Sequence, residues 1–180
     1  MQFSRQKLCS TWWLLLTACL VAAPLHAHLM VAQHGTLNIV GDRAFMVLSL
    51  PVSAFEGVDI NSDGQVSMAE FDQSQALISQ VVKQKVRLSE QNNQLPLMGL
   101  MVSAEAPHHG DEQVISQMIV MAQFPLENAD LSQLDFQMGL FGLSQPEQIM
   151  KMTATRASDR QKLTFELSAQ APKKALKFTQ

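Results

Sequence analysis

The segment from residue 59 to residue 70 constrains the local fold of this chain more tightly than any other stretch. It reads Asp-Ile-Asn-Ser-Asp-Gly-Gln-Val-Ser-Met-Ala-Glu, so that oxygen-bearing side chains alternate along its first half. Asp59, Asn61 and Asp63 come at the first, third and fifth positions. Gly64 follows, where a sharp turn would strain a residue with a Cβ. This spacing favours a tightly curled loop whose side-chain oxygens converge.

The second half of the segment completes a set of oxygen donors. Gln65 would offer its backbone carbonyl, Ser67 would bind directly or through a water, and Glu70 would close the shell with both carboxylate oxygens. This is the pattern of an EF-hand calcium loop. The sequence therefore predicts Ca²⁺ as a cofactor, with these ligands: Asp59, Asn61, Asp63, Gln65, Ser67 and Glu70. One alternative is a solvated turn of Asn, Asp and Gly residues that binds no metal. The other is a former EF-hand loop whose affinity for calcium is too low for it to be occupied.

The residues on either side of the loop favour helices. Ser67 and Glu70 form an S-x-x-E capping box, which predicts an outgoing helix over residues 68–84. Pro51 suits the first position of a short incoming helix over residues 51–58. We therefore expect an EF-hand-like helix-loop-helix insertion at residues 51–84.

The first 27 residues are typical of a secretory signal peptide. Arg5 and Lys7 form a basic start, an apolar stretch covers residues 8–23, and Ala27 is the expected cleavage site. The sequence thus predicts a periplasmic or secreted protein. The alternative is a lipoprotein box at Leu-Thr-Ala-Cys, which would anchor the chain by a lipid on Cys19.

Cleavage would also change the composition. Both cysteines, Cys9 and Cys19, lie in the signal segment, so stability after cleavage could not depend on disulfides. Removing Arg5 and Lys7 would take the formal net charge from −3 to −5. That balance argues against nucleic acid as a partner, because phosphate binding needs a basic stripe.

Hydrophobic alternation dominates the rest of the chain. A hairpin is predicted over residues 36–50 around a Gly-Asp turn, and further strands are expected at 85–89, 94–103, 114–124, 136–140, 149–155 and 163–169. Short strands separated by polar turns predict a mainly β fold, a β-sandwich-like domain over residues 28–170. Residues 171–180 are expected to be a loose basic tail.

The order of these parts resembles a known family. A signal ending in Ala27-His28-Leu29 precedes the hairpin and the acidic loop, and Asp-Phe-Gln-Met-Gly-Leu-Phe at residues 135–141 precedes the last strands. This is similar to the periplasmic N-terminal domain that precedes the membrane part of HupE/UreJ-like proteins. The resemblance implies an exported β-domain that acts as a binding or interaction module, with a membrane-protein partner.

Histidine and methionine offer an alternative metal chemistry. After cleavage His28 would be N-terminal and could bind copper or nickel, joined by His34 or by His108 and His109. The plainer interpretation is a set of solvated histidines. Two methionine pairs, Met98 with Met101 and Met118 with Met121, could suit Cu(I), although gap-filling in the core is the expected role. A periplasmic copper- or nickel-binding protein, or an accessory subunit of a metal transporter, is the second hypothesis.

The sequence offers little for catalysis. It has no G-x-S-x-G elbow, no H-E-x-x-H pair and no phosphate-binding loop, and the adjacent Asp111 and Glu112 show no acid–base pairing. We expect a non-enzymatic binding or structural module. A lone loop with three carboxylates outside the cytosol predicts a calcium dissociation constant of roughly 10⁻⁴ to 10⁻³ M.

Overall fold

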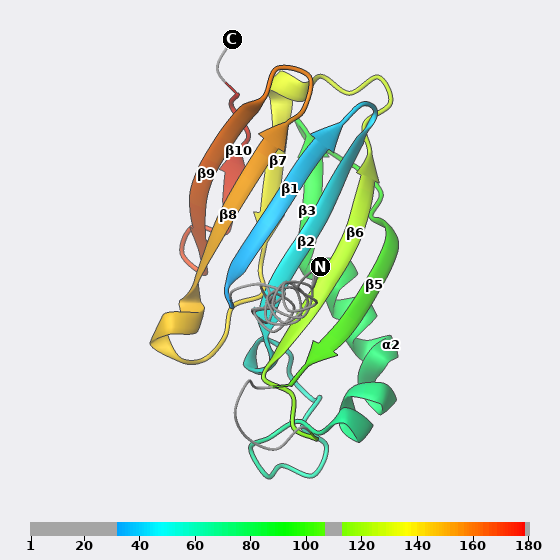
Figure 1. Ribbon diagram of the computed structural model, residues 1–180, viewed down its shortest axis with the longest axis vertical. Coiled ribbons are helices and arrows are strands. Elements are labelled where there is room, and N and C mark those ends of the chain that lie inside the picture. The colour runs from blue at the N-terminus through cyan, green and yellow to red at the C-terminus, as the bar shows by residue number, and fades with distance from the viewer. Residues whose placement is uncertain (1–31, 107–112, 179–180) are drawn as a thin grey trace, which may run out of the picture.

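The computed structural model describes residues 32–106 and 113–178 of the chain. Within these ranges the protein is mainly β, as predicted, with two sheets and one α-helix. Figure 1 shows the larger sheet facing the viewer, with the helix beside one of its edges.

The larger sheet has six strands in the order β5-β6-β2-β1-β8-β9. All neighbouring pairs are antiparallel except β1 and β8, which run parallel. The predicted hairpin is confirmed as β1 and β2, and Gly41 makes its turn with a φ of 59°. The strands are β1 (His34–Val40), β2 (Arg43–Pro51), β5 (Met98–Glu105), β6 (Gln117–Pro125), β8 (Ile149–Arg156) and β9 (Gln161–Ser168).

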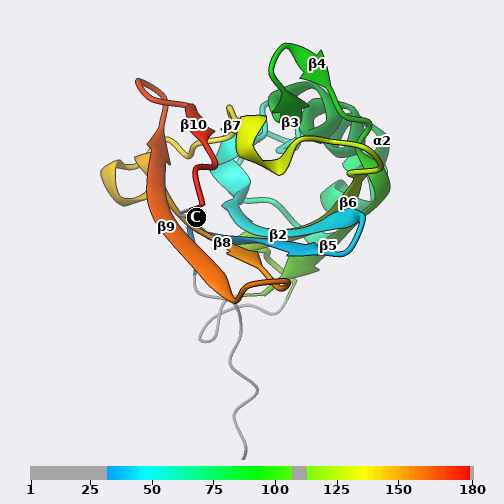
Figure 2. The same cartoon turned by 90° about the horizontal axis from the view of Figure 1, so that it is seen from above.

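The smaller sheet has four strands in the order β10-β7-β3-β4. It lies on the same side of the six-stranded sheet as the α-helix, as Figure 2 shows. Its strands are β3 (Val86–Glu90), β4 (Asn93–Gln94), β7 (Leu134–Met138) and β10 (Lys173–Ala175). Two 3-10 turns, η3 (Leu131–Gln133) and η4 (Gln145–Gln148), precede β7 and β8.

Strict alternation of side chains builds a single core between these layers. On β6 every second residue is buried, and the same period holds on β1, β7 and β8. The buried apolar residues form one continuous cluster, whose largest fully buried members include Phe124, Phe136, Leu37, Met46 and Leu48.

The helix α2 (Met68–Lys85) confirms the prediction for residues 68–84. Ser67 caps its first turn through both halves of the capping box. Phe71, Ile78 and Val82 lie on one face of the helix and are buried in the core. Lys83 and Lys85 lie in the last turn, where positive charge interacts favourably with the helix dipole.

The predicted incoming helix at residues 51–58 is wrong. Pro51 ends β2, and only the 3-10 turn η2 (Val52–Ala54) follows. Phe55 is already extended, and Gly57 has a φ of 76°, which no right-handed helix accommodates. The acidic loop is therefore entered from a strand and left through a helix.

The prediction of one strand over residues 94–103 is also wrong. The segment divides into β4 and β5, which belong to different sheets. Pro96 lies between them and has no N–H to give to a ladder, so the chain crosses from one sheet to the other there.

The C-terminal segment is part of the fold, so the expectation of a loose tail is wrong for residues 173–178. β10 pairs with β7, and the Lys173 ammonium lies 2.8 Å from the Asp135 carboxylate. Leu176 is fully buried, and the Phe178 ring lies 4.9 Å from the Arg156 guanidinium carbon. The two apolar residues among the lysines are the reason that the segment docks.

Candidate metal centre

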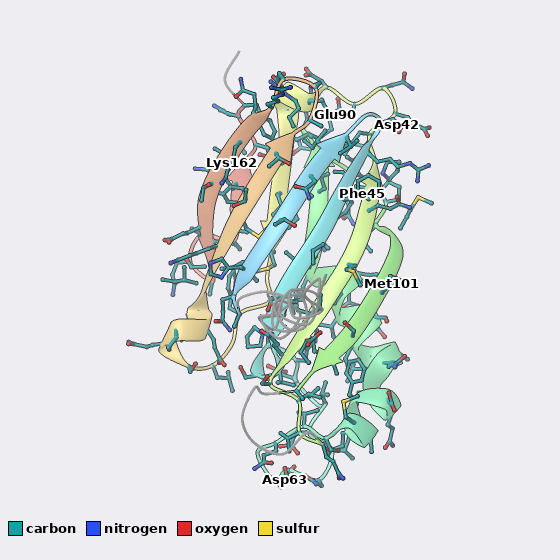
Figure 3. The ribbon with its side chains drawn as sticks, in the orientation of Figure 1. Asp42, Phe45, Asp63, Glu90, Met101 and Lys162 are labelled. Carbon is teal, nitrogen blue, oxygen red and sulfur yellow. The ribbon has the colours of Figure 1, made fainter. Side chains whose placement is uncertain are left out.

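The acidic loop lies between η2 and α2, at the end of the molecule opposite the β1–β2 turn. Figure 3 shows Asp63 at this end and Asp42 near the other. The segment is mostly exposed to solvent, except that Val66 and Glu70 are buried.

The loop is curled around its own acidic side chains. The Asp59 carboxylate accepts hydrogen bonds from the Asp63 N–H at 3.2 Å and from the Gly64 N–H at 2.9 Å. The Asn61 Oδ1 accepts from the Asp63 N–H at 2.9 Å, and the Asp63 Oδ1 accepts from the Gln65 N–H at 2.8 Å. The three predicted side-chain ligands at the start of the loop thus all accept hydrogen bonds from the backbone N–H groups of residues 63–65.

Glu70 joins the beginning of the loop to its end. Its Oε1 accepts from the backbone N–H groups of Ile60, at 3.0 Å, and Asn61, at 3.2 Å. Its Oε2 accepts from the Ser67 N–H at 2.9 Å and the Ser67 hydroxyl at 2.8 Å. These bonds, led by the one from the Ser67 N–H, lower the pKa of Glu70 to about 2, so the carboxylate is ionised at neutral pH.

Gly64 meets the backbone requirement that the sequence predicted. Its φ is +84°, and a Cβ built on it would meet no atom within 4 Å. The glycine is therefore needed for its left-handed conformation alone and not for space. Ser62 shares this conformation, with a φ of 60°, at the other side of the tight turn.

The loop concentrates negative charge. Asp59, Asp63 and Glu70 are anionic, and none of them forms an ion pair with a basic side chain in the described part of the chain. Asn61 donates its amide N–H to Asp63 at 2.9 Å, a contact between neutral and charged groups. A group of carboxylates that has no basic partner among the described residues attracts cations electrostatically.

The donors are all oxygen atoms, which suits Ca²⁺ and disfavours soft metals. Residues 32–106 and 113–178 hold no group of three or more His, Cys, Asp or Glu side chains close enough to bind a metal between them. The predicted set contains three carboxylates, those of Asp59, Asp63 and Glu70, and the structure does not gather them into such a group. Asn61, Ser67 and the Gln65 carbonyl would supply the other half of the set. The residues present therefore fit calcium in type. Both Glu70 oxygens would have to exchange backbone hydrogen bonds for the ion.

Val66, at the eighth position of the loop, pairs with a distant segment. Its carbonyl accepts from the Ile115 N–H at 2.8 Å, and the Met68 N–H donates to the Gln113 carbonyl at 2.9 Å. Ser67 and Val114 form the antiparallel bridge between these bonds. The sequence offered no signal for this contact, since it joins residues more than forty positions apart.

A cleft of about 770 Å³ adjoins the loop, and the sequence did not indicate it. Asp59, Gly64 and Gln65 line it together with Phe141 and Leu143. The cleft places apolar surface directly beside the acidic loop.

Only one histidine of the alternative ligand set lies within the described residues. His34 lies at the start of β1, with its Nδ1 2.9 Å from the Ala32 carbonyl. His28, His108, His109, Asp111 and Glu112 fall outside the described residues, as do the signal segment and Cys19. Among the methionines, Met118 is buried as expected for a core residue, whereas Met98 and Met101 are exposed.

Comparison with known proteins adds no family. No protein-family model matches the chain, and no curated protein matches it. Neither of the described ranges contains a helix with the length and apolar character needed to cross a membrane.

Proposed function

We propose that this protein is an exported, non-enzymatic calcium-binding module. The observation that carries the proposal is the acidic loop, in which Asp59, Asn61 and Asp63 accept hydrogen bonds from the backbone N–H groups of residues 63–65 around the left-handed Gly64. The proposed architecture is a β-sandwich-like domain into which the EF-hand-like segment is inserted.

Asp59, Asn61, Asp63, Ser67 and Glu70 would hold the ion through side-chain oxygens, and Gln65 through its carbonyl. When bound, the cation would supply positive charge to a group of carboxylates that otherwise repel one another. Without the ion, Glu70 bridges residues 60 and 61 to Ser67, and binding would exchange these hydrogen bonds for coordination of the ion.

The ion is proposed to be structural. The expected affinity, roughly 10⁻⁴ to 10⁻³ M, is the range of extracellular calcium modules. The pairing of Val66 with Ile115 supports this role, because an ordered loop would hold the segment that precedes β6 beside the start of α2.

Export and partner belong to the same proposal. The signal-like segment 1–27 supports a periplasmic or secreted location, with a lipid on Cys19 as the alternative form of attachment. The resemblance to the periplasmic domain of HupE/UreJ-like proteins supports a membrane protein as the partner. Co-purification from membranes would test that part separately.

A calcium titration followed by thermal unfolding tests the site. At 10 mM Ca²⁺ and the expected affinity, the native state gains about 1.4–2.7 kcal/mol. For a chain of this size that gain raises the melting temperature by roughly 3–10 °C. Glu70→Gln should remove most of the shift, because it takes one carboxylate from the proposed shell.

Asp72→Asn is the matched control. It neutralises an exposed carboxylate two residues beyond the loop, on α2, and should keep the full calcium shift. An unchanged melting temperature of the wild-type protein at 10 mM Ca²⁺ would refute the proposal. If both variants lost the same part of the calcium-induced shift in melting temperature, the shift would reflect general screening of negative charge and not binding at the loop.

A further inference from the structure

Three methionines lie together on the outer face of the six-stranded sheet. On β6 the inner residues, among them Met118 and Val120, are buried, so Met121 on the alternate register faces outward. Met121 is paired directly with Met101 on the edge strand β5, and with Val47 on β2. Figure 3 shows Met101 on β5 and Phe45 on β2 of this sheet.

A β-bulge brings the third methionine to the same face. Met98 and Met101 are three residues apart, and in a regular strand they would point to opposite faces. The register instead shifts between them, so that Met98 pairs with Gln123 and Met101 with Met121. Gly99 sits in the bulge with a φ of 60°, the left-handed conformation that such a bulge requires.

The strand register places the three methionine side chains at neighbouring positions of one sheet face. Directly opposed residues have Cβ atoms about 4.5–5.5 Å apart, and next-but-one neighbours on one face are about 7 Å apart. Methionine has three rotatable side-chain bonds, which allow its sulfur to move toward a common point. Met98 is 50 % exposed and Met101 58 %, so packing in the core does not account for them.

The surroundings select the kind of ligand. The pairing positions beside the three methionines carry no carboxylate; they hold Gln123 and the apolar side chains of Phe45 and Val47. Gln123 accepts a hydrogen bond from Arg43 at 3.0 Å, so its amide oxygen already has a partner. Hard cations such as Ca²⁺ find no anionic oxygen here, whereas soft thioethers suit Cu(I).

We propose that Met98, Met101 and Met121 form a thioether site for a soft monovalent metal ion of the Cu(I) type. The site shares no ligand with the calcium loop, because β5 and β6 supply all three sulfurs. The bulge at Gly99 places Met98 on the same sheet face as Met101 and so completes the set of three methionines.

Titration with Ag(I), a redox-inert substitute for Cu(I), tests the proposal on the full chain. Methionine-methyl NMR distinguishes this site from the cysteines and histidines elsewhere in the sequence, because each methionine gives its own signal. The methyl signals of Met98, Met101 and Met121 should move together and saturate at one equivalent. Cu(I), kept reduced and competed with a chromogenic chelator, should bind at least tenfold more weakly to the triple Met→Leu variant.

Met68→Leu is the control, since Met68 is an exposed methionine on α2 outside the cluster. It should leave the three signals and the Cu(I) affinity unchanged. Leucine keeps the apolar area of methionine but has no sulfur. A triple variant with unchanged Cu(I) affinity would therefore overturn the proposal. Equal movement of the Met68 signal, or none in the cluster, would also overturn it. If the triple variant folds poorly, the methionine-methyl NMR spectrum of the wild-type protein during the Ag(I) titration still tests the proposal.

Discussion

Glu70 has two roles that compete for the same two oxygens. Without an ion, its carboxylate accepts hydrogen bonds from the backbone N–H groups of Ile60, Asn61 and Ser67. With an ion, the same oxygens would close the coordination shell. The residue therefore stabilises the loop in either state, and the ion replaces contacts that are already favourable. This competition is consistent with a weak site.

The depressed pKa of Glu70 predicts a specific acid response. The carboxylate titrates at about 2 in the folded protein, against 4.5 for the unperturbed group. Its contribution to stability is thus fully present above pH 4.5, and is lost as the pH falls toward 2. In calcium-free denaturant titrations, the stability difference between the wild-type protein and Glu70→Gln should shrink across this interval. A difference that is constant from pH 6 to pH 2.5 would contradict the assignment.

The loop is paired with the segment that leads into β6. Val66 and Met68 exchange backbone hydrogen bonds with Ile115 and Gln113, and the Ser116 N–H continues to the Glu105 carbonyl at the end of β5. A change in the order of the loop is therefore passed directly to the connection between two strands of the larger sheet.

Hydrogen exchange should detect this link. The Ile115 and Met68 amides donate across the bridge, so calcium should slow their exchange by stabilising the loop that holds them. The Leu95 amide, which donates to the Leu88 carbonyl in the other sheet, serves as the internal control and should not respond. Equal slowing at all three sites would indicate a global gain in stability and no local coupling.

The C-terminal segment contributes both a strand to the smaller sheet and a side chain to the core between the sheets. β10 extends the smaller sheet, and Leu176 enters the core with its N–H bonded to the Leu134 carbonyl at 2.8 Å. Residues at the end of the chain thus contribute to the same hydrophobic cluster as the first hairpin.

Leu176→Ala tests this contribution. Removing a fully buried leucine side chain costs about 2–5 kcal/mol, through lost transfer energy and the cavity left behind. Chemical denaturation should show a lower midpoint with an unchanged slope. Leu143→Ala, at an 81 % exposed position, is the control and should cost little. A tail that does not dock would give similar values for both variants.

The local features of this protein were predictable from sequence because each is contained within a few neighbouring residues. The capping box at Ser67 and Glu70, the left-handed glycine at position 64 and the period of two along β6 need no distant partner to be recognised. The predicted helix before the loop was wrong for a similarly local reason, since Gly57 takes a conformation that ends any helix there.

Tertiary structure alone decided which elements meet. Pairing of Val66 with Ile115, docking of Leu176 beside Leu134 and the register shift at Gly99 all depend on backbone groups from separate parts of the chain. Such contacts form only when the conformational entropy lost on ordering the chain is offset by the apolar surface buried in the core. That burial depends on the whole assembled structure, so a short stretch of sequence does not reveal it.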